Sequence, residues 1–126
     1  MTNNSLIYLS HSPQRGRGVF AAKAIPAGKL IEVCPVIILS AKDREIIHGT
    51  FLHDYYFLWD PDGCAIALGY GSIYNHSSDP NADYAMDYEK QTIEFHSIKN
   101  ISKGEEIMVN YTEGDDVMTE LWFEER

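Results

Sequence analysis

The chain has 126 residues, a net charge of −9, 44% hydrophobic residues and 12% aromatic residues. This length suits one compact domain, which can bury roughly two-thirds of its unfolded surface without a disulfide or a metal. The hydrophobic content excludes the disordered class of protein, and the negative charge argues against binding to a phosphate backbone.

Neither a targeting sequence nor a membrane span is expected. The first residues lack a charged start followed by an apolar run, so they do not resemble a secretory signal. The longest apolar stretch, 33–39, is broken by Pro35 and is too short to cross a membrane. Cys34 and Cys64 lack CxxC spacing, so we expect two free buried thiols and no metal site. The expected location is intracellular, in the cytoplasm or the nucleus.

The first notable segment, 15–20, reads Arg-Gly-Arg-Gly-Val-Phe. Gly16 and Gly18 flank Arg17, and glycines let a backbone approach a ligand closely because no Cβ intervenes. Taken alone, the segment predicts a plain tight turn. It lacks the third glycine of the dinucleotide-binding fingerprint.

Turn residues divide the rest of the chain into short segments, and helical periodicity is scarce. Ser40 can cap one helix, with Asp43 three residues later, and Gly49 can end it. The aromatic run 55–59 is expected in the core, with one member lining a substrate channel as the alternative. Apolar and alternating patterns predict strands at 30–39, 55–59, 64–68, 84–88, 92–97 and 106–111.

The segment 75–81 reads Asn-His-Ser-Ser-Asp-Pro-Asn. An asparagine side chain both donates and accepts hydrogen bonds, so Asn75 could hold the amino-acid end of a zwitterionic ligand. The alternative is a turn in which the side chains satisfy their own backbone, and composition favours this alternative for 78–81.

The segment 104–111 predicts a turn that starts a strand ending at Tyr111. A tyrosine at such a position is typically a rim residue, with its ring buried and its hydroxyl in water. The following segment, 113–126, contains six carboxylates. This segment either is a solvated tail or attracts a basic partner.

Together, the GxG, NHSxxPN and GEExxxxY segments resemble, in this order, the SET-domain family of protein lysine methyltransferases. The resemblance spans roughly 6–112 of a single domain, 1–126, and leaves 113–126 as an acidic C-terminal segment. It implies a mostly β fold, a β-clip of short curled sheets with one short helical insertion. A knot-like crossing near the C-terminus would bring Asn75 and His76 beside the third segment.

The resemblance also implies S-adenosylmethionine as the cofactor and a protein lysine as the methyl acceptor. Residues 16–18 would hold the methionine part through backbone groups. Asn75 would contact the amino-acid end, and the backbone of His76 would meet the adenine. Tyr111 would be the catalytic tyrosine, at the point where the cofactor pocket meets a lysine channel. Tyr84 would line that channel and limit the number of methyl groups added.

Two features depart from the family pattern. The run Ser72-Ile73-Tyr74 lacks the arginine that often precedes the NHS segment, and no cysteine follows Cys64 to form a channel-closing zinc module. Trp122, which would also border the cofactor, is the expected cover together with its neighbour Phe123. The alternatives for this pair are a hydrophobic anchor or a dimer contact, and a second copy of the chain in a homodimer could also supply the cover.

The predicted function is methyl transfer from S-adenosylmethionine to a lysine of a basic protein partner, a class that includes histone-like proteins, with no direct nucleic-acid or membrane partner. One alternative is a non-catalytic module that binds S-adenosylmethionine or a basic peptide. Another is a β-clip interaction domain that never binds the cofactor.

Overall fold

The computed structural model describes residues 6–13 and 16–111. Within these residues the chain is mostly β, with one α-helix and one short 3-10 helix. The elements in chain order are β1 (Ile7–Ser12), β2 (Gly16–Ala21), β3 (Leu30–Leu39), α1 (Ala41–His48), the 3-10 helix (Phe51–Asp54), β4 (Phe57–Trp59), β5 (Gly63–Ala67), β6 (Asn75–His76), β7 (Ala82–Asp87), β8 (Thr92–Ser97) and β9 (Glu106–Val109).

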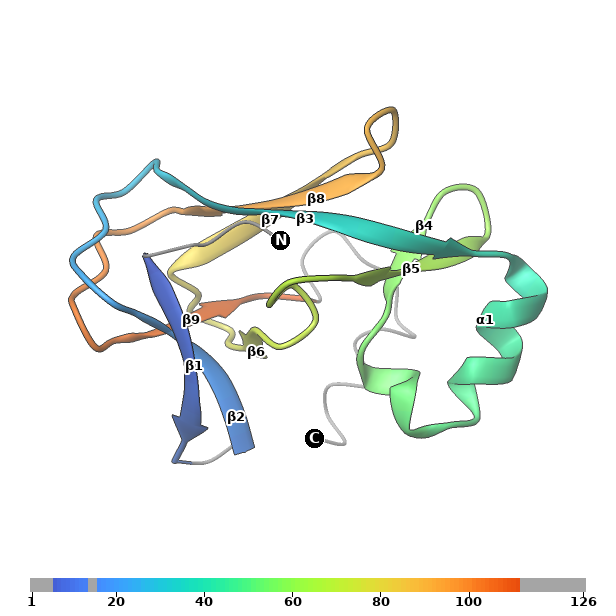
Figure 1. The fold of residues 1–126 in the computed structure, drawn as a ribbon, viewed down its shortest axis with the longest axis horizontal. Helices are drawn as coiled ribbons and strands as arrows, with labels where there is room; N and C mark the ends of the chain where they lie inside the picture. The colour runs from blue at the N-terminus through green and yellow to red at the C-terminus, as the bar shows by residue number, and fades with distance from the viewer. Residues whose placement is uncertain (1–5, 14–15, 112–126) are drawn as a thin grey trace.

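The strands form two sheets (Figure 1). The smaller sheet has the order β1-β2-β9-β6, and the larger has the order β4-β5-β3-β8-β7. In the described residues, β6 and β9 are the only neighbouring strands that run parallel. A parallel pair joins segments far apart in the chain, so this pairing determines which motifs meet.

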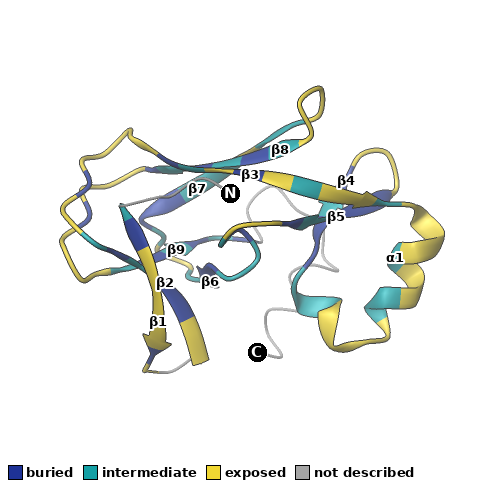
Figure 2. Ribbon diagram, in the orientation of Figure 1, coloured by how far each residue is buried: buried dark blue, intermediate teal, exposed yellow. Residues whose placement is uncertain are grey.

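The core lies between the two sheets. In β8, Ile93, Phe95 and Ser97 alternate with more exposed residues, as expected of a strand with one buried face. Val19 of β2 lies opposite Ile107 of β9, and both side chains are fully buried. Figure 2 shows buried residues along β8 and β9, whereas α1 is largely exposed. Burial therefore fixes the register of the strands that carry the motifs.

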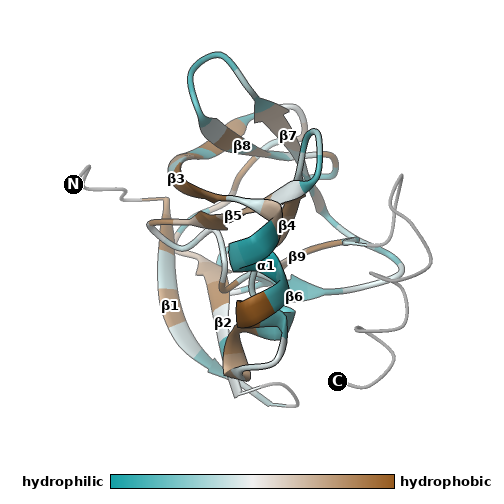
Figure 3. Cartoon of the chain, turned by 90° about the vertical axis from the view of Figure 1, so that its right-hand side faces the viewer, coloured by the Kyte–Doolittle hydropathy of each residue, from teal (hydrophilic) through white to brown (hydrophobic). Residues whose placement is uncertain are grey.

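The helix α1 has the ends predicted from the sequence. The Ser40 hydroxyl accepts a 3.1 Å hydrogen bond from the amide of Asp43, and the amide of Gly49 donates to the carbonyl of Ile46 at 3.2 Å. No residue of α1 is buried, and Figure 3 shows most of it as hydrophilic. No helix in the described part of the chain is long and apolar enough to cross a membrane.

The predicted strand at 30–39 and the one at 92–97 are confirmed with their bounds. The prediction of a tight turn at 15–20 is wrong, because residues 16–21 form β2 and pair with β1. Val19 and Ala21 on this strand are fully buried, and burying them outweighs the preference of glycine for turns. Cys34 and Cys64 are free and buried, as expected.

Candidate active site

The NHS segment and the C-terminal motif lie side by side. Asn75 pairs with Met108 and His76 pairs with Val109 in the parallel β6–β9 ladder. The amide of Tyr111, just beyond β9, donates a 3.2 Å hydrogen bond to Nδ1 of His76. The sequence prediction that residues 75–76 meet the segment ending at Tyr111 is therefore confirmed.

Asn75 is 2% exposed and makes two hydrogen bonds with its side-chain nitrogen. One goes to the carbonyl of Arg17 at 2.9 Å, and the other goes to Oε2 of Glu106 at 2.7 Å. No residue in the described ranges donates to the side-chain oxygen of Asn75. The side-chain nitrogen thus holds Asn75 against the backbone of the GxG segment, and the side-chain oxygen can accept a further hydrogen bond.

Gly18 is required because two other side chains pack against it. A Cβ at this position would lie 3.0 Å from Nδ2 of Asn75 and would collide with the carboxylate of Glu106. Gly16 has a φ of +78°, a left-handed conformation that glycine adopts readily. The two glycines therefore have separate roles: one shapes the backbone, and the other admits Asn75 and Glu106.

Glu106 is a residue to which the sequence analysis assigned no role. Its carboxylate accepts a 3.0 Å hydrogen bond from the Ser12 hydroxyl in addition to the bond from Asn75. It therefore links β1, β6 and β9 around the GxG strand. The sequence did offer one indication of this role. Glu106 belongs to the GEExxxxY segment, and a charged residue inside a predicted strand needs a partner.

Tyr111 is not a rim tyrosine with a solvated hydroxyl. The residue is 8% exposed, and its hydroxyl donates a 2.7 Å hydrogen bond to the main-chain oxygen of Tyr74. The side chain points inward, toward the residue that precedes β6. The bond fixes the direction of the hydroxyl.

Three aromatic rings pack together here, and we call them the aromatic cluster: Phe57 of β4, Tyr84 of β7 and Tyr111 just beyond β9. The ring centroids lie 5.3 Å apart for Phe57 and Tyr84, 5.5 Å apart for Phe57 and Tyr111, and 5.8 Å apart for Tyr84 and Tyr111. Of the aromatic run 55–59, Phe57 thus joins the candidate site, while Trp59 is buried beside Tyr88.

The turn after His76 behaves differently at its two ends. The Ser77 hydroxyl accepts from the amide of Asp79 at 3.0 Å, which is a local turn of the expected kind. Asn81 does not satisfy its own turn, because its side chain accepts from Met108 N and donates to Glu106 O, both at 2.9 Å. The local alternative is therefore wrong for Asn81, which fastens the turn to β9.

The two departures noted in the sequence have different outcomes. Ser72, in place of the arginine, donates to the carbonyl of Ala67 at 3.0 Å and accepts from its amide at 3.2 Å, so it closes the turn before β6. Trp122, Phe123 and the rest of segment 113–126 lie outside the described residues. Their expected part in covering the channel stays a prediction.

The chemistry of this site suits a cation that has lost its water. The aromatic cluster presents π faces, and the Tyr111 hydroxyl adds an oriented oxygen. The nearby Asn75 oxygen can accept from an ammonium group. Such surroundings stabilise developing positive charge.

Comparison with known proteins identifies the arrangement. The SET domain family model matches residues 16–112. A histone-lysine N-methyltransferase of Schizosaccharomyces pombe, specific for H3 lysine-37, is 35% identical over 123 residues, which is 96% of this chain and 79% of the relative.

Solved structures of similar fold include proteins described as histone methyltransferases. A Plasmodium falciparum protein described as a candidate histone methyltransferase superposes with a TM-score of 0.70 at 29% identity, over 85% of this chain and 93% of that one. The Neurospora SET domain protein DIM-5, a histone lysine methyltransferase, shares the fold with a TM-score of 0.64 at 20% identity, over 84% and 52% of the two chains. The chain therefore belongs to the SET-domain family of protein-lysine methyltransferases, enzymes that take the methyl group from S-adenosylmethionine.

Proposed function

We propose that this enzyme methylates lysine side chains of a basic, histone-like protein and that Tyr111 is its catalytic residue. The observation that carries the proposal is the buried hydrogen bond from the Tyr111 hydroxyl to Tyr74, within the aromatic cluster and beside the NHS segment. The Schizosaccharomyces pombe relative acts on histone H3 by its name, which supports this substrate class.

The residues around β2 and β6 fit the cofactor. The free side-chain oxygen of Asn75 suits the ammonium of its amino-acid end, and the neighbouring carbonyl of Arg17 belongs to the segment proposed to hold the methionine part. The backbone of His76 is proposed to meet the adenine. When bound, the cofactor supplies an electrophilic methyl group on a positively charged sulfur.

The aromatic cluster is proposed to prepare the lysine for attack. A lysine with its ordinary pKa of about 10.4 is almost fully protonated at neutral pH, and its neutral form costs roughly 4 kcal/mol. Phe57 and Tyr84 present apolar ring faces beside Tyr111. An amine enclosed by such faces loses water, which lowers its pKa and raises the fraction of the nucleophilic form.

Tyr111 is proposed to orient the lysine amine and to stabilise charge. Because its hydroxyl proton is engaged by the Tyr74 carbonyl, its oxygen can accept from the amine without turning away. Positive charge reaches the nitrogen as the methyl group is transferred, and an oriented oxygen in a dry site stabilises that charge. Holding the amine in line contributes further, since alignment removes most of the entropy of encounter.

A basic substrate agrees with the charge of the enzyme. Asp and Glu number 19 against 10 Lys and Arg, so a lysine-rich protein tail is attracted, whereas a nucleic acid is repelled. A histone-like substrate also agrees with the expected location inside the cell.

The test is incubation of the enzyme with isotope-labelled S-adenosylmethionine and a panel that includes histone H3, other histones and acidic control proteins. We expect label on lysines of the basic proteins, mapped by mass spectrometry, and its loss in Tyr111→Phe. Calorimetric binding of the cofactor without transfer to any lysine would instead support the non-catalytic module. Equal labelling of acidic and basic proteins would contradict the histone-like substrate class.

A further inference from the structure

We propose that Glu32 is a positioning residue for Tyr111 and acts through the side chain of Tyr74. This inference rests on the proposed catalytic role of Tyr111. Glu32 lies on β3 of the larger sheet, whereas Tyr111 follows β9 of the smaller one. Tyr74 connects the two, because its hydroxyl meets Glu32 and its main-chain oxygen meets Tyr111.

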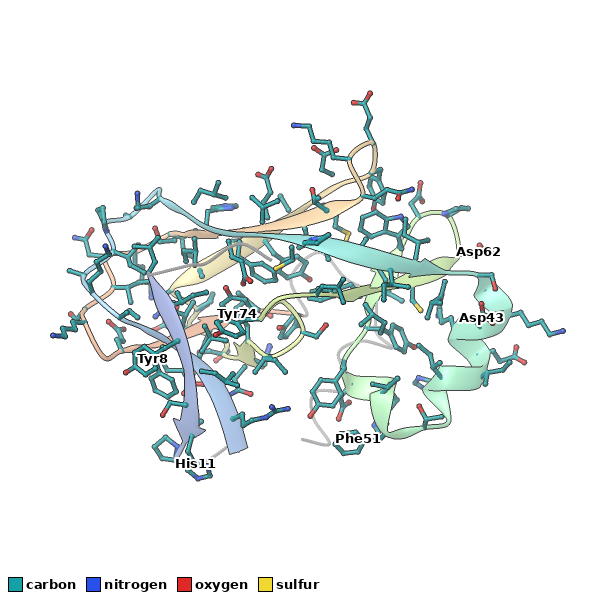
Figure 4. The ribbon with its side chains drawn as sticks, in the orientation of Figure 1. Tyr8, His11, Asp43, Phe51, Asp62 and Tyr74 are labelled. Atoms are coloured by element: carbon teal, nitrogen blue, oxygen red, sulfur yellow. The ribbon has the colours of Figure 1, made fainter. Side chains whose placement is uncertain are left out.

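Tyr74 is held firmly at both its ring and its hydroxyl. It is 1% exposed, and its ring stacks on Phe95 with centroids 4.3 Å apart and planes 20° apart. The hydroxyl donates a 2.8 Å hydrogen bond to Oε1 of Glu32. Figure 4 shows Tyr74 in the middle of the molecule, close to β6. A buried hydroxyl needs a hydrogen-bond partner, so Glu32 determines the position of the Tyr74 side chain.

The second oxygen of Glu32 holds the other end of the same turn. Oε2 accepts a 3.0 Å hydrogen bond from the amide of Tyr70, and the carbonyl of Tyr70 accepts from the amide of Ile73 at 2.9 Å. Gly69 has a φ of +65°, and a Cβ there would collide with the Glu32 carboxylate. One carboxylate thus fixes both ends of residues 70–74, whose last carbonyl orients the Tyr111 hydroxyl.

The protonation of Tyr74 supports this arrangement. Burial, followed by the nearby Glu32 carboxylate, raises the pKa of Tyr74 well above its ordinary value. The hydroxyl therefore stays protonated and keeps donating to Glu32 over the neutral pH range. The carbonyl of Tyr74 remains in place for Tyr111 under the same conditions.

Glu32→Gln tests the inference with little change in size. Glu32 accepts from Tyr74 and Tyr70 with separate oxygens, whereas a glutamine has one oxygen and a nitrogen that only donates, so one of the two present hydrogen bonds must be lost or reversed. We expect kcat, at saturating cofactor and histone and per folded molecule, to fall by about tenfold, as a small misplacement near the reaction does. Tyr74→Phe, which removes only the hydroxyl, is expected to lower kcat in the same way. Cofactor Kd, measured by calorimetry, should stay within about twofold in both variants.

A double-mutant comparison separates positioning from general stability. In a Tyr111→Phe background, adding Glu32→Gln should change the residual kcat by less than about twofold, since the hydroxyl to be positioned is gone. Ser97→Ala is the matched control: Ser97 is 1% exposed, and its hydroxyl donates to Pro26 O at 2.6 Å on another part of the core. We expect it to lower the melting temperature and leave kcat unchanged.

An isotope-labelled tyrosine NMR spectrum gives a readout independent of activity. The ring signal of Tyr111, assigned by its loss in Tyr111→Phe, should shift in Glu32→Gln and Tyr74→Phe but not in Ser97→Ala. If the wild-type protein methylated no substrate, the proposed function would be overturned. The NMR signal of Tyr111 would still test whether Glu32 positions this residue. An unmoved Tyr111 signal, or wild-type kcat in folded Glu32→Gln and Tyr74→Phe, would overturn the positioning role alone.

Discussion

The side-chain nitrogen of Asn75 donates a 2.7 Å hydrogen bond to the carboxylate of Glu106, across the parallel pair β6 and β9. The same nitrogen donates to the carbonyl of Arg17 on β2, so one amide ties the three motif segments of the sequence together. A hydrogen bond to a charged acceptor is stronger than a neutral one, and this one is sheltered from water. The proposed cofactor site and the pairing of β6 with β9 thus depend on the same side chain.

Asn75→Ala is expected to weaken S-adenosylmethionine binding. The substitution removes the free oxygen proposed to meet the ligand ammonium, and a hydrogen bond to a charged group is worth about 1.5–3 kcal/mol. Kd measured by calorimetry should rise by about tenfold to a hundredfold. At saturating cofactor, kcat should fall far less than in Tyr111→Phe.

The matched control for Asn75 is Asn100→Ala. Asn100 also uses its side chain on the backbone, accepting from the amide of Ala27 at 2.9 Å, but it is exposed and lies in the loop before β9. The cofactor Kd of Asn100→Ala should equal that of the wild type. An unchanged Kd in Asn75→Ala would remove this residue from the proposed binding site.

Gly18→Ala is expected to destabilise the fold. The added methyl group must displace the Asn75 amide and the Glu106 carboxylate, both of which hold other groups in place. Overpacking of this kind costs about 1–3 kcal/mol. Gly49→Ala provides the control, because its Cβ would meet only the carbonyl of Ile46 at an ordinary 3.6 Å. Urea denaturation should show a loss for Gly18→Ala and a change within about 0.5 kcal/mol for Gly49→Ala.

The sequence correctly predicted the features that depend on interactions between neighbouring residues. The caps of α1 follow from the hydrogen-bonding groups of Ser40 and the turn at Gly49, and both are confirmed. The strand at 92–97 follows from its alternation and is also confirmed. The strand β2 was missed because glycine favours turns locally, whereas burial of Val19 against Ile107 decides its structure.

The candidate site needed more than local patterns. The resemblance to the SET family correctly placed residues 75–76 beside the segment ending at Tyr111, a contact that sequence separation would not suggest. The partners of these residues could not be read from the motifs. Glu32 and Phe57 lie in strands whose local sequences carry no sign of the tyrosines they meet. Tertiary packing alone creates those contacts.

Tyr111→Phe is expected to remove turnover and spare cofactor binding. The change deletes the buried hydroxyl that donates to Tyr74 and leaves the ring in the aromatic cluster. Loss of one oriented polar group at a reacting centre costs about 10²–10³ in kcat. Single-turnover transfer to histone substrate and cofactor calorimetry separate the two effects. A Kd that rises as much as kcat falls would assign Tyr111 to binding.

Tyr84→Phe is expected to shift the product toward more highly methylated lysine. Tyr84 lies in the aromatic cluster, and removing its hydroxyl leaves room beside Tyr111 for an amine that already carries a methyl group. Tyr88→Phe is the control, since Tyr88 is half-exposed and its hydroxyl meets only Met86 among the contacts described. Mass spectrometry of the methylated peptide gives the product ratio. The same ratio in both variants would exclude Tyr84 as a product-limiting residue.

The stability of the enzyme is expected to fall above pH 9, and Cys34 is expected to contribute to that fall. Burial first, and then the Glu32 carboxylate, raises the pKa of the Cys34 thiol far above its ordinary value of 9.0. The folded chain therefore keeps a proton that the unfolded chain loses. The stabilising contribution is complete below pH 9 and is lost as the pH rises, by up to about 1.4 kcal/mol per pH unit.

Urea denaturation at pH 7 to 10 measures this loss. Cys34→Ala should lower stability at pH 7, because it leaves a small void in the core, yet show a flatter decline between pH 9 and 10. In Cys64→Ala the decline should change less. Burial also raises the pKa of Cys64, but the positive charge of Arg44 opposes the shift. The same slope in wild type and Cys34→Ala would contradict the raised pKa of Cys34, because the thiol would then ionise equally well in the folded and unfolded chains.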